Sequence, residues 1–359
     1  MVETSLSRLV ASKAMAAIHK KFGANILRMG SDCDGERIGR IPTEIFRLDH
    51  ALGGGFPVGR VSVLWGAKSA AKTTTFVKTL ANATRMCASC WQYTPCACGE
   101  YRDPAIVFLD VEGTFDIPWA KKLGLDPDKY LLSVPEYAEQ TLDIAEAMVL
   151  NGVDILVIDS LAFLTPMKEI EKSVSDDTVG LQARQLGKGI RKFVAAINKR
   201  KNETGQGPTL LFTNQIRMKV GVMFGNPETQ PGGMAPGYVS TTETKLYGGK
   251  YEMDEVLGTP LSVGFKFRVE KNKSAAAKME GDFTLLLSDT DTRRTGDAVN
   301  EGPIISMAEK IGLVSGGGTK WTALDQVFKS KSLIEKEMLT NPEFYGKLHS
   351  AVMSVLLQD

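Results

Sequence analysis

Four short apolar runs constrain the fold of this 359-residue chain more than any other feature. They read RVSVLW, AIVFLD, DILVID and TLLFTN, and the stretches between them are long enough for helical crossovers. Strands that are buried on both faces of a parallel sheet consist of such near-continuous apolar runs. The pattern therefore predicts an α/β fold, with helices on both faces of a mostly parallel sheet.

The segments on either side of these runs have other patterns. The first 35 residues or so form an amphipathic helix pattern with a short extended tail, too small for its own core, so we expect this part to pack on another subunit. The runs TTETKLY, VGFKFRVEKN and DFTLLLSD alternate in polarity and predict antiparallel strands at the end of the sheet. After residue 290, helical segments flank the glycine-rich turn SGGGTKW. We therefore divide the chain into an N-terminal helix and linker, a core and a small α/β C-terminal domain, with bounds 1–38, 39–289 and 290–359.

Charge is almost balanced, with 43 basic and 42 acidic residues, so contact with a polyanion must depend on local patches. The sequence has no run of eighteen apolar residues, and its start lacks the apolar core of a signal peptide. These observations predict a cytoplasmic protein with no membrane contact.

The stretch WGAKSAAKTTT, residues 65–75, matches the phosphate-loop pattern G-x-x-x-x-G-K-[ST] except that Ala71 replaces the second glycine. It follows an apolar run and precedes a helical stretch, which is the context that such a loop requires. Lys72 would reach the β- and γ-phosphates of ATP, and Thr73 would offer its hydroxyl to Mg²⁺. The predicted nucleotide-binding residues of the loop are Gly66, Ala67, Lys68, Ser69, Ala70, Ala71, Lys72, Thr73 and Thr74. The alternative is a turn of small residues without a ligand, and the cost of Ala71 depends on whether its position needs a positive φ.

Polar residues at the ends of the other apolar runs complete a site. Asp159 ends DILVID and is the predicted second Mg²⁺ ligand. Glu112 follows AIVFLD and could orient or deprotonate the attacking water, and Asn214–Gln215 after TLLFT could sense the γ-phosphate. In a doubly wound sheet these strand ends face one crevice. For Glu112 the alternative is an ordinary carboxylate at the end of a strand.

A group of cysteines lies between the phosphate-loop helix and the run AIVFLD. Four cysteines within residues 87–98 offer four thiolates in one compact loop: Cys87, Cys90, Cys96 and Cys98. Their pairing as C-x-x-C and C-x-C predicts a tetrahedral Zn²⁺ site with a structural or partner-binding role. Free thiols and a redox pair are the alternatives.

Three longer stretches resemble the bacterial RecA recombinases, and the resemblance extends over nearly the whole chain. They read FLDVEGTFDIPWAKKLGLD, VIDSLAFLTPMKEIE and FTNQIRMKVGVMFGNPETQPGG. The resemblance implies a RecA-like P-loop ATPase core and a DNA-dependent ATPase that forms filaments on single-stranded DNA and exchanges strands with homologous duplex DNA. It implies ATP and Mg²⁺ as cofactors, and as partners both forms of DNA, further copies of the chain, single-strand-binding protein and mediators.

The resemblance also implies roles for individual residues. It makes Glu112 the catalytic glutamate and Gln215 the γ-phosphate sensor, and it places Asp116 and Trp119 where the family contacts adenine. The predicted catalytic set is Lys72, Glu112, Gln215, Lys271 and Lys273, of which the last two would reach the ATP of the neighbouring subunit. For this lysine pair the alternative is a solvated turn.

Two segments are the predicted DNA-binding loops. Basic and apolar side chains after Gln215 combine cations for phosphates with groups that cover bases. The predicted DNA-binding residues are Val179, Arg184, Arg191, Arg217, Met218, Lys219, Val220, Phe224, Gly232 and Gly233. A basic helix face without the resemblance would be a solvated surface. Binding would show little sequence preference and would weaken as salt rises.

Two features depart from the family pattern: the cysteine-rich insertion, and a C-terminus without an acidic run. They favour a divergent member, encoded by a phage or mobile element and acting in a bacterial cytoplasm. The leading interpretation is a recombinase. A filament-forming regulatory or architectural paralogue without strand exchange is the alternative, and a ring-shaped helicase is a weaker one.

Overall fold

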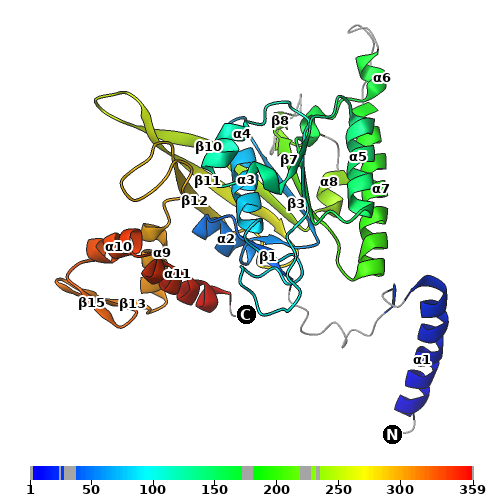
Figure 1. The fold of residues 1–359 in the computed structure, drawn as a ribbon, viewed down its shortest axis with the longest axis horizontal. Helices are drawn as coiled ribbons and strands as arrows, with labels where there is room; N and C mark the ends of the chain where they lie inside the picture. The colour runs from blue at the N-terminus through cyan, green and yellow to red at the C-terminus, as the bar shows by residue number, and fades with distance from the viewer. Residues whose placement is uncertain are drawn as a thin grey trace.

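The computed structural model describes residues 3–23, 26–27, 38–171, 181–218, 228–231 and 235–357. Among these residues the central feature is an eight-stranded sheet (Figure 1). In order across the sheet its strands are β12 (Glu280–Leu286), β11 (Pro260–Asn272), β10 (Thr242–Met253), β3 (Val61–Gly66), β7 (Thr209–Gln215), β6 (Ile155–Asp159), β4 (Ile106–Asp110) and β5 (Leu131–Ser133). The strands from β10 to β5 are parallel, and β11 is antiparallel to both of its neighbours.

The four apolar runs form the four strands β3, β7, β6 and β4, as predicted. Their side chains alternate between two cores, so that Phe108 faces one side of the sheet and Leu109 the other. Helices cover both faces (Figure 1). One side carries α2 (Phe46–Leu52), α3 (Lys72–Ala83) and α4 (Ile117–Lys122), and the other carries α5 (Ala138–Leu150) and α7 (Leu181–Thr204). The predicted α/β fold class is therefore confirmed.

The run TTETKLY is antiparallel to one neighbour, β11, and parallel to the other, β3. It begins β10, which lies parallel to β3, with Thr242 opposite Ser62. The connection from β7 returns the chain to the edge where β3 begins, so β10 must run in the same direction as β3. A short turn after Met253 then makes β11 antiparallel. The predicted antiparallel end of the sheet is confirmed, since β11 is antiparallel to both β10 and β12, and β10 joins this end to the parallel strands.

The C-terminal elements surround a core of their own. They are α9 (Glu301–Lys310), β13 (Val314–Gly317), β14 (Lys320–Ala323), β15 (Gln326–Phe328), α10 (Lys331–Thr340) and α11 (Pro342–Leu356). Phe46 of α2 packs into this core, and its backbone N–H donates to Asn300 Oδ1 at 3.0 Å. Asn300 in turn donates to the carbonyl of Glu44 at 2.8 Å. These contacts join the C-terminal elements to the rest of the molecule.

Helix α1 (Glu3–Phe22) lies apart from the sheet in Figure 1. The remaining short elements are β1 (Arg40–Ile41), β2 (Phe56–Pro57), β8 (Arg217–Met218), β9 (Glu228–Thr229), α6 (Met167–Ile170), α8 (Ala235–Val239) and two 3₁₀ turns, Pro127–Lys129 and Leu161–Phe163. Among the residues described, no helix combines the length and the apolar character that crossing a membrane would take.

Candidate nucleotide, metal and DNA sites

The phosphate loop joins the end of β3 to the start of α3. Lys72 is largely buried, and its Nζ donates to the carbonyl of Ala67 at 2.7 Å and to that of Gly66 at 3.3 Å, across the loop. Burial lowers the pKa of Lys72, while the carboxylates of Asp159 and Glu112 act against this shift. A Cβ on Gly66 would lie 2.2 Å from the carbonyl oxygen of Leu246, so only glycine fits between β3 and β10. Backbone N–H groups at the start of α3 and an ammonium group thus meet in a loop suited to phosphate.

Ala71 adopts the left-handed conformation, with φ 60° and ψ 22°, immediately before α3. The glycine of the phosphate-loop pattern is therefore needed here for its positive φ, because an L-residue pays roughly 1–2 kcal/mol in this region. The carbonyl of Ala71 accepts from Thr75 N at 2.9 Å and so starts the helix. The chain holds this strained residue in place through the helix that follows.

We expect the substitution Ala71→Gly to raise the free energy of unfolding by about 0.5–1 kcal/mol, since relief of the positive φ exceeds the entropy cost of glycine. Urea denaturation measures this change, and an ATP titration measures the accompanying gain in affinity. Ala70→Gly is the matched control, because Ala70 is buried and does not have a positive φ. It should destabilise the protein. Equal effects of the two substitutions would contradict the strain at Ala71.

Oxygen ligands for a cation meet at the start of α3. The Thr73 hydroxyl donates to Asp159 Oδ2 at 2.5 Å, and the Thr213 hydroxyl donates to the other oxygen of the same carboxylate. Burial raises the pKa of Asp159, and the nearby carboxylates of Glu112 and Asp110 raise it further. A hydroxyl beside such an acidic group fits Mg²⁺, which prefers hard oxygen ligands and would offset this negative charge.

Glu112 lies just beyond β4, where three polar side chains meet. Its Oε1 accepts from Gln215 Nε2 at 3.1 Å and from the Ser160 hydroxyl at 2.8 Å. Strand register explains the meeting, because Asp110 lies opposite Asp159 and Gly66 lies opposite Gln215 at one edge of the sheet. Ser160 and Thr213 are part of this site but were not predicted. Only the position of Ser160, directly after Asp159, could have indicated it.

The two residues predicted to contact adenine lie at the start of α4. Asp116 is the N-cap of this helix, and its Oδ1 accepts from Trp119 N at 2.9 Å. The Trp119 side chain packs, partly buried, against the core on the α3 side of the sheet. The cap and the packing therefore fix both residues at α4, which begins beyond the end of β4, where the candidate nucleotide site lies.

Lys271 and Lys273 lie at the opposite edge of the sheet from the phosphate loop. Lys271 pairs with Glu243 on β10, beside the start of β3, and its Nζ donates to Gly237 O at 2.5 Å and to Ser240 Oγ at 3.1 Å. Lys271 lies level with Val63 and Lys273 with Val61, so they are three and five residues of β3 from Gly66, or about 10 and 17 Å at strand rise. The structure therefore does not bring these lysines to the phosphate loop of their own chain.

Some predicted DNA-binding residues lie on exposed surfaces near the nucleotide site. Arg184 and Arg191 are exposed on α7, opposite the buried Ile190. Arg217 and Met218 form β8, and Arg217 donates to Gln215 Oε1 at 3.4 Å. The other six predicted residues lie outside the described residues: Val179, Lys219, Val220, Phe224, Gly232 and Gly233. The described part links the candidate sensor Gln215 directly to the start of one predicted DNA loop.

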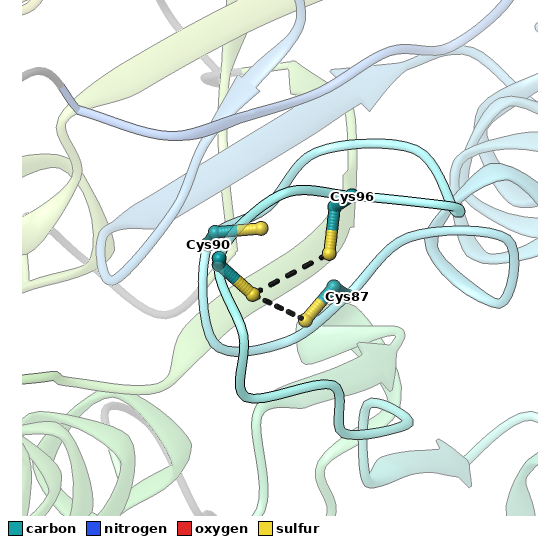
Figure 2. A group of neighbouring side chains, drawn as sticks. Cys87, Cys90 and Cys96 are labelled. Atoms are coloured by element: carbon teal, nitrogen blue, oxygen red, sulfur yellow. Dashed lines mark hydrogen bonds between the residues drawn. The ribbon is translucent and has the colours of Figure 1, made fainter.

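The four clustered cysteines converge in space (Figure 2). Their Sγ atoms all lie within 4.8 Å of one another, with Cys98 at 3.7 Å from Cys87 and 3.4 Å from Cys96. A tetrahedral Zn²⁺ with Zn–S bonds of about 2.3 Å requires sulfur atoms about 3.8 Å apart. The four thiols therefore have the spacing of a zinc site.

Backbone groups around Cys87 favour its thiolate. Burial raises the pKa of this thiol, but hydrogen bonds from the backbone N–H groups of Arg102, Ser89 and Cys90 outweigh burial and lower the pKa to about 6. The carbonyl of Cys87 also accepts from Trp91 N at 2.7 Å, which closes the turn between the first two cysteines. Because a metal binds the thiolate form of cysteine, the lowered pKa of Cys87 favours cation binding at this turn.

The parallel sheet and the phosphate loop at its edge define a P-loop ATPase. The model of the RecA N-terminal domain matches residues 9–290. The chain is 34% identical over 341 residues to Protein RecA of Fusobacterium nucleatum subsp. nucleatum, an alignment that covers 93% of this chain and 81% of that protein. The chain belongs to the RecA family, whose members are DNA-dependent ATPases.

Proposed function

We propose that this protein is an ATP-dependent recombinase that assembles on single-stranded DNA and exchanges strands with homologous duplex DNA. The observation that carries the proposal is the contact between Glu112 and Gln215 at 3.1 Å, continued from Gln215 to Arg217 at 3.4 Å. A group that detects the γ-phosphate is thus connected to a segment suited to DNA. Such a connection lets bound nucleotide control the DNA-binding segment.

Each residue of the proposed ATPase site has a defined task. Glu112 accepts two hydrogen bonds through Oε1, which orient its carboxylate to take a proton from water. Lys72 spans the loop and would carry its positive charge to the outer phosphates. Thr73 and Asp159 would hold Mg²⁺, which neutralises charge on the phosphates when bound. The strained residue Ala71 lies beside these residues, and the strain replaces none of them.

Assembly into a filament is supported by two separate surfaces. Strand β5 is an edge strand of the sheet, and Leu131 within it and Val134 just after it are 65% and 58% exposed. An exposed apolar edge strand is a template for pairing with another chain. At the other site, Lys271 and Lys273 lie too far from their own phosphate loop, so a neighbour's ATP is the nucleotide that they could reach. Hydrolysis would then depend on assembly.

We further propose that the four clustered cysteines hold Zn²⁺. Four thiolates in a closed tetrahedral set leave no position for a substrate, so the metal would be structural. It would constrain a loop whose residues from Cys96 to Arg102 are mostly exposed. Strand β4 begins shortly after this loop, at Ile106.

A strand-exchange assay on circular single-stranded and linear duplex DNA tests the recombinase proposal. We expect ATP to support joint molecules, and electron microscopy to show helical filaments on the single strand. Binding should weaken steeply as salt rises, because the contacts are to phosphates. Filaments that never form joint molecules would contradict strand exchange and favour the architectural alternative. Closed rings that unwind forks would favour a helicase.

A further inference from the structure

We define residues 271–275 as the lysine turn. The cysteine-rich loop, residues 87–98, lies at the same end of the sheet as this turn, where the parallel strands begin. The loop follows the C-terminal end of α3, about 18 Å along the helix from the phosphate loop. It also precedes the start of β4, so it lies at the edge where the parallel strands begin. The lysine turn is at this edge too, because Lys273 N donates to Thr241 O and Thr241 N donates to Val61 O, at the start of β3.

Trp91 connects the cysteine-rich loop to the segment that enters β1. It lies next to Cys90 in sequence, is only 6% exposed and belongs to the core on the α3 side of the sheet. A Cβ on Gly39 would lie 3.0 Å from the Cβ of Trp91, so the Trp91 side chain packs closely against the backbone of Gly39. The cysteine-rich loop therefore holds, through the hydrogen bond from Trp91 N to Cys87 O, a side chain that packs against Gly39.

Arg40, the next residue, holds the lysine turn. One guanidinium nitrogen donates to the carbonyl of Ser274 at 2.7 Å, and the other donates to the Ser274 hydroxyl at 3.1 Å and to Leu52 O at 3.0 Å. Ser274 directly follows Lys273. Close packing at Gly53, where a Cβ would lie 2.7 Å from the Cβ of Ala275, keeps the turn against the C-terminal end of α2. Arg40 thus clamps the turn immediately beside Lys273.

The surroundings of Arg40 disfavour its positive charge, so other contacts must hold its side chain there. Burial lowers the pKa of its guanidinium, and the positive charge of Arg60 lowers it further, so both work against a charged group here. A groove of about 590 Å³ runs between the cysteine-rich loop and the Arg40 segment, and it is lined by cations, Arg40, Arg60 and Lys201, without an acidic side chain among the lining residues described. With like charges around it, Arg40 is held by its three hydrogen bonds and by the position of its backbone, which follows the contact of Trp91 with Gly39.

We propose that the metal-held cysteine-rich loop is a positioning element for the lysines that act on the ATP of the neighbouring subunit. Loss of the metal frees Trp91, the Gly39–Arg40 segment shifts, and Ser274 releases the lysine turn. The inference rests on the proposed function, in which Lys271 and Lys273 serve a neighbour. The chain's own phosphate loop, at the opposite edge, keeps its affinity for ATP.

A subunit-mixing experiment with full-length protein tests this inference. Alone, the Cys96→Ser variant should lose about tenfold in DNA-dependent ATPase rate, with unchanged affinity for ATP, since only transition-state charge stabilisation is lost. The Lys72→Arg variant hydrolyses little ATP itself but presents an intact loop and lysine turn. An equimolar mixture of the two should raise the rate per Cys96→Ser subunit about fivefold, because about half of those subunits then meet an intact neighbour.

The control mixture pairs Cys96→Ser with Lys271→Ala, and it should show no recovery, since neither partner supplies an intact lysine turn. Arg40→Ala keeps all four cysteines, so this variant should retain zinc. Its ATPase rate should fall to a similar extent and should recover equally when it is mixed with Lys72→Arg. This variant tests the inference if Cys96→Ser does not fold. Co-assembled filaments without recovery, or wild-type rates in metal-free protein, would overturn the inference. A wild-type protein without DNA-dependent ATPase would instead overturn the proposed function and this inference with it.

Discussion

Glu112→Gln should lower the DNA-dependent ATPase rate at least about 100-fold, because loss of a positioned general base typically costs 10²–10⁴ in rate. The amide has the size of the carboxylate and can still accept hydrogen bonds from Gln215 and Ser160, whose donors lie 3.1 and 2.8 Å from Glu112. Binding of ATP, measured by titration, should therefore change little. A steady-state assay with saturating single-stranded DNA measures the rate.

Ser160→Ala is the matched control for this prediction. It removes one of the two hydrogen bonds that orient Glu112 but keeps the carboxylate, so the rate should fall by about tenfold or less. If Glu112→Gln retained more than a tenth of the wild-type rate, Glu112 would be a structural carboxylate, as the alternative interpretation of the sequence allowed. If Ser160→Ala lowered the ATPase rate more than Glu112→Gln, the role of general base would not belong to Glu112.

Cys96→Ser should reduce bound zinc from about one ion per chain to nearly none. A structural Zn²⁺ contributes about 10–16 kcal/mol through four ligands, so losing one thiolate costs roughly 3 kcal/mol, or about a hundredfold in affinity. Mass spectrometry of protein purified without added metal measures the zinc content. Limited proteolysis should also show faster cleavage within residues 87–98, since the metal no longer constrains that loop.

Cys33→Ser is the matched control, because Cys33 is the fifth cysteine and lies outside the cluster in the sequence. It should keep the wild-type zinc content. Natively purified wild-type protein without zinc, but with four titratable thiols in the cluster, would contradict the metal site and favour free thiols. A redox pair would instead appear as a disulfide that forms and breaks reversibly.

Much of the core and of the candidate nucleotide site was predictable because both depend on local patterns. A buried parallel strand is apolar along its whole length, so β3, β4, β6 and β7 were visible as runs. Asp159 and Gln215 are the last residues of β6 and β7, so the runs also indicated their positions. The direction of β10 was not predictable, since alternating polarity says nothing about which neighbour a strand joins.

Residues that act through contacts between distant segments were also hidden. Ser160 and Thr213 carry no motif, and they join the site only because β6 and β7 end at the same edge of the sheet. The connection from Trp91 through Arg40 to Ser274 spans more than 180 residues of sequence and depends on close backbone packing at Gly39. Periodicity and spacing describe neighbours along the chain, and they contain no information about such pairs.

The sequence by itself determined the class of fold, the phosphate loop with its unusual alanine, and the group of four cysteines, because all three are patterns among residues close in the chain. Only the tertiary structure decided that Ala71 has a φ of 60°, that the four sulfur atoms lie within 4.8 Å, and that the lysine turn is on the far edge of the sheet. Backbone strain, ligand convergence and strand register arise from packing between distant segments, so they exist only once the chain has folded.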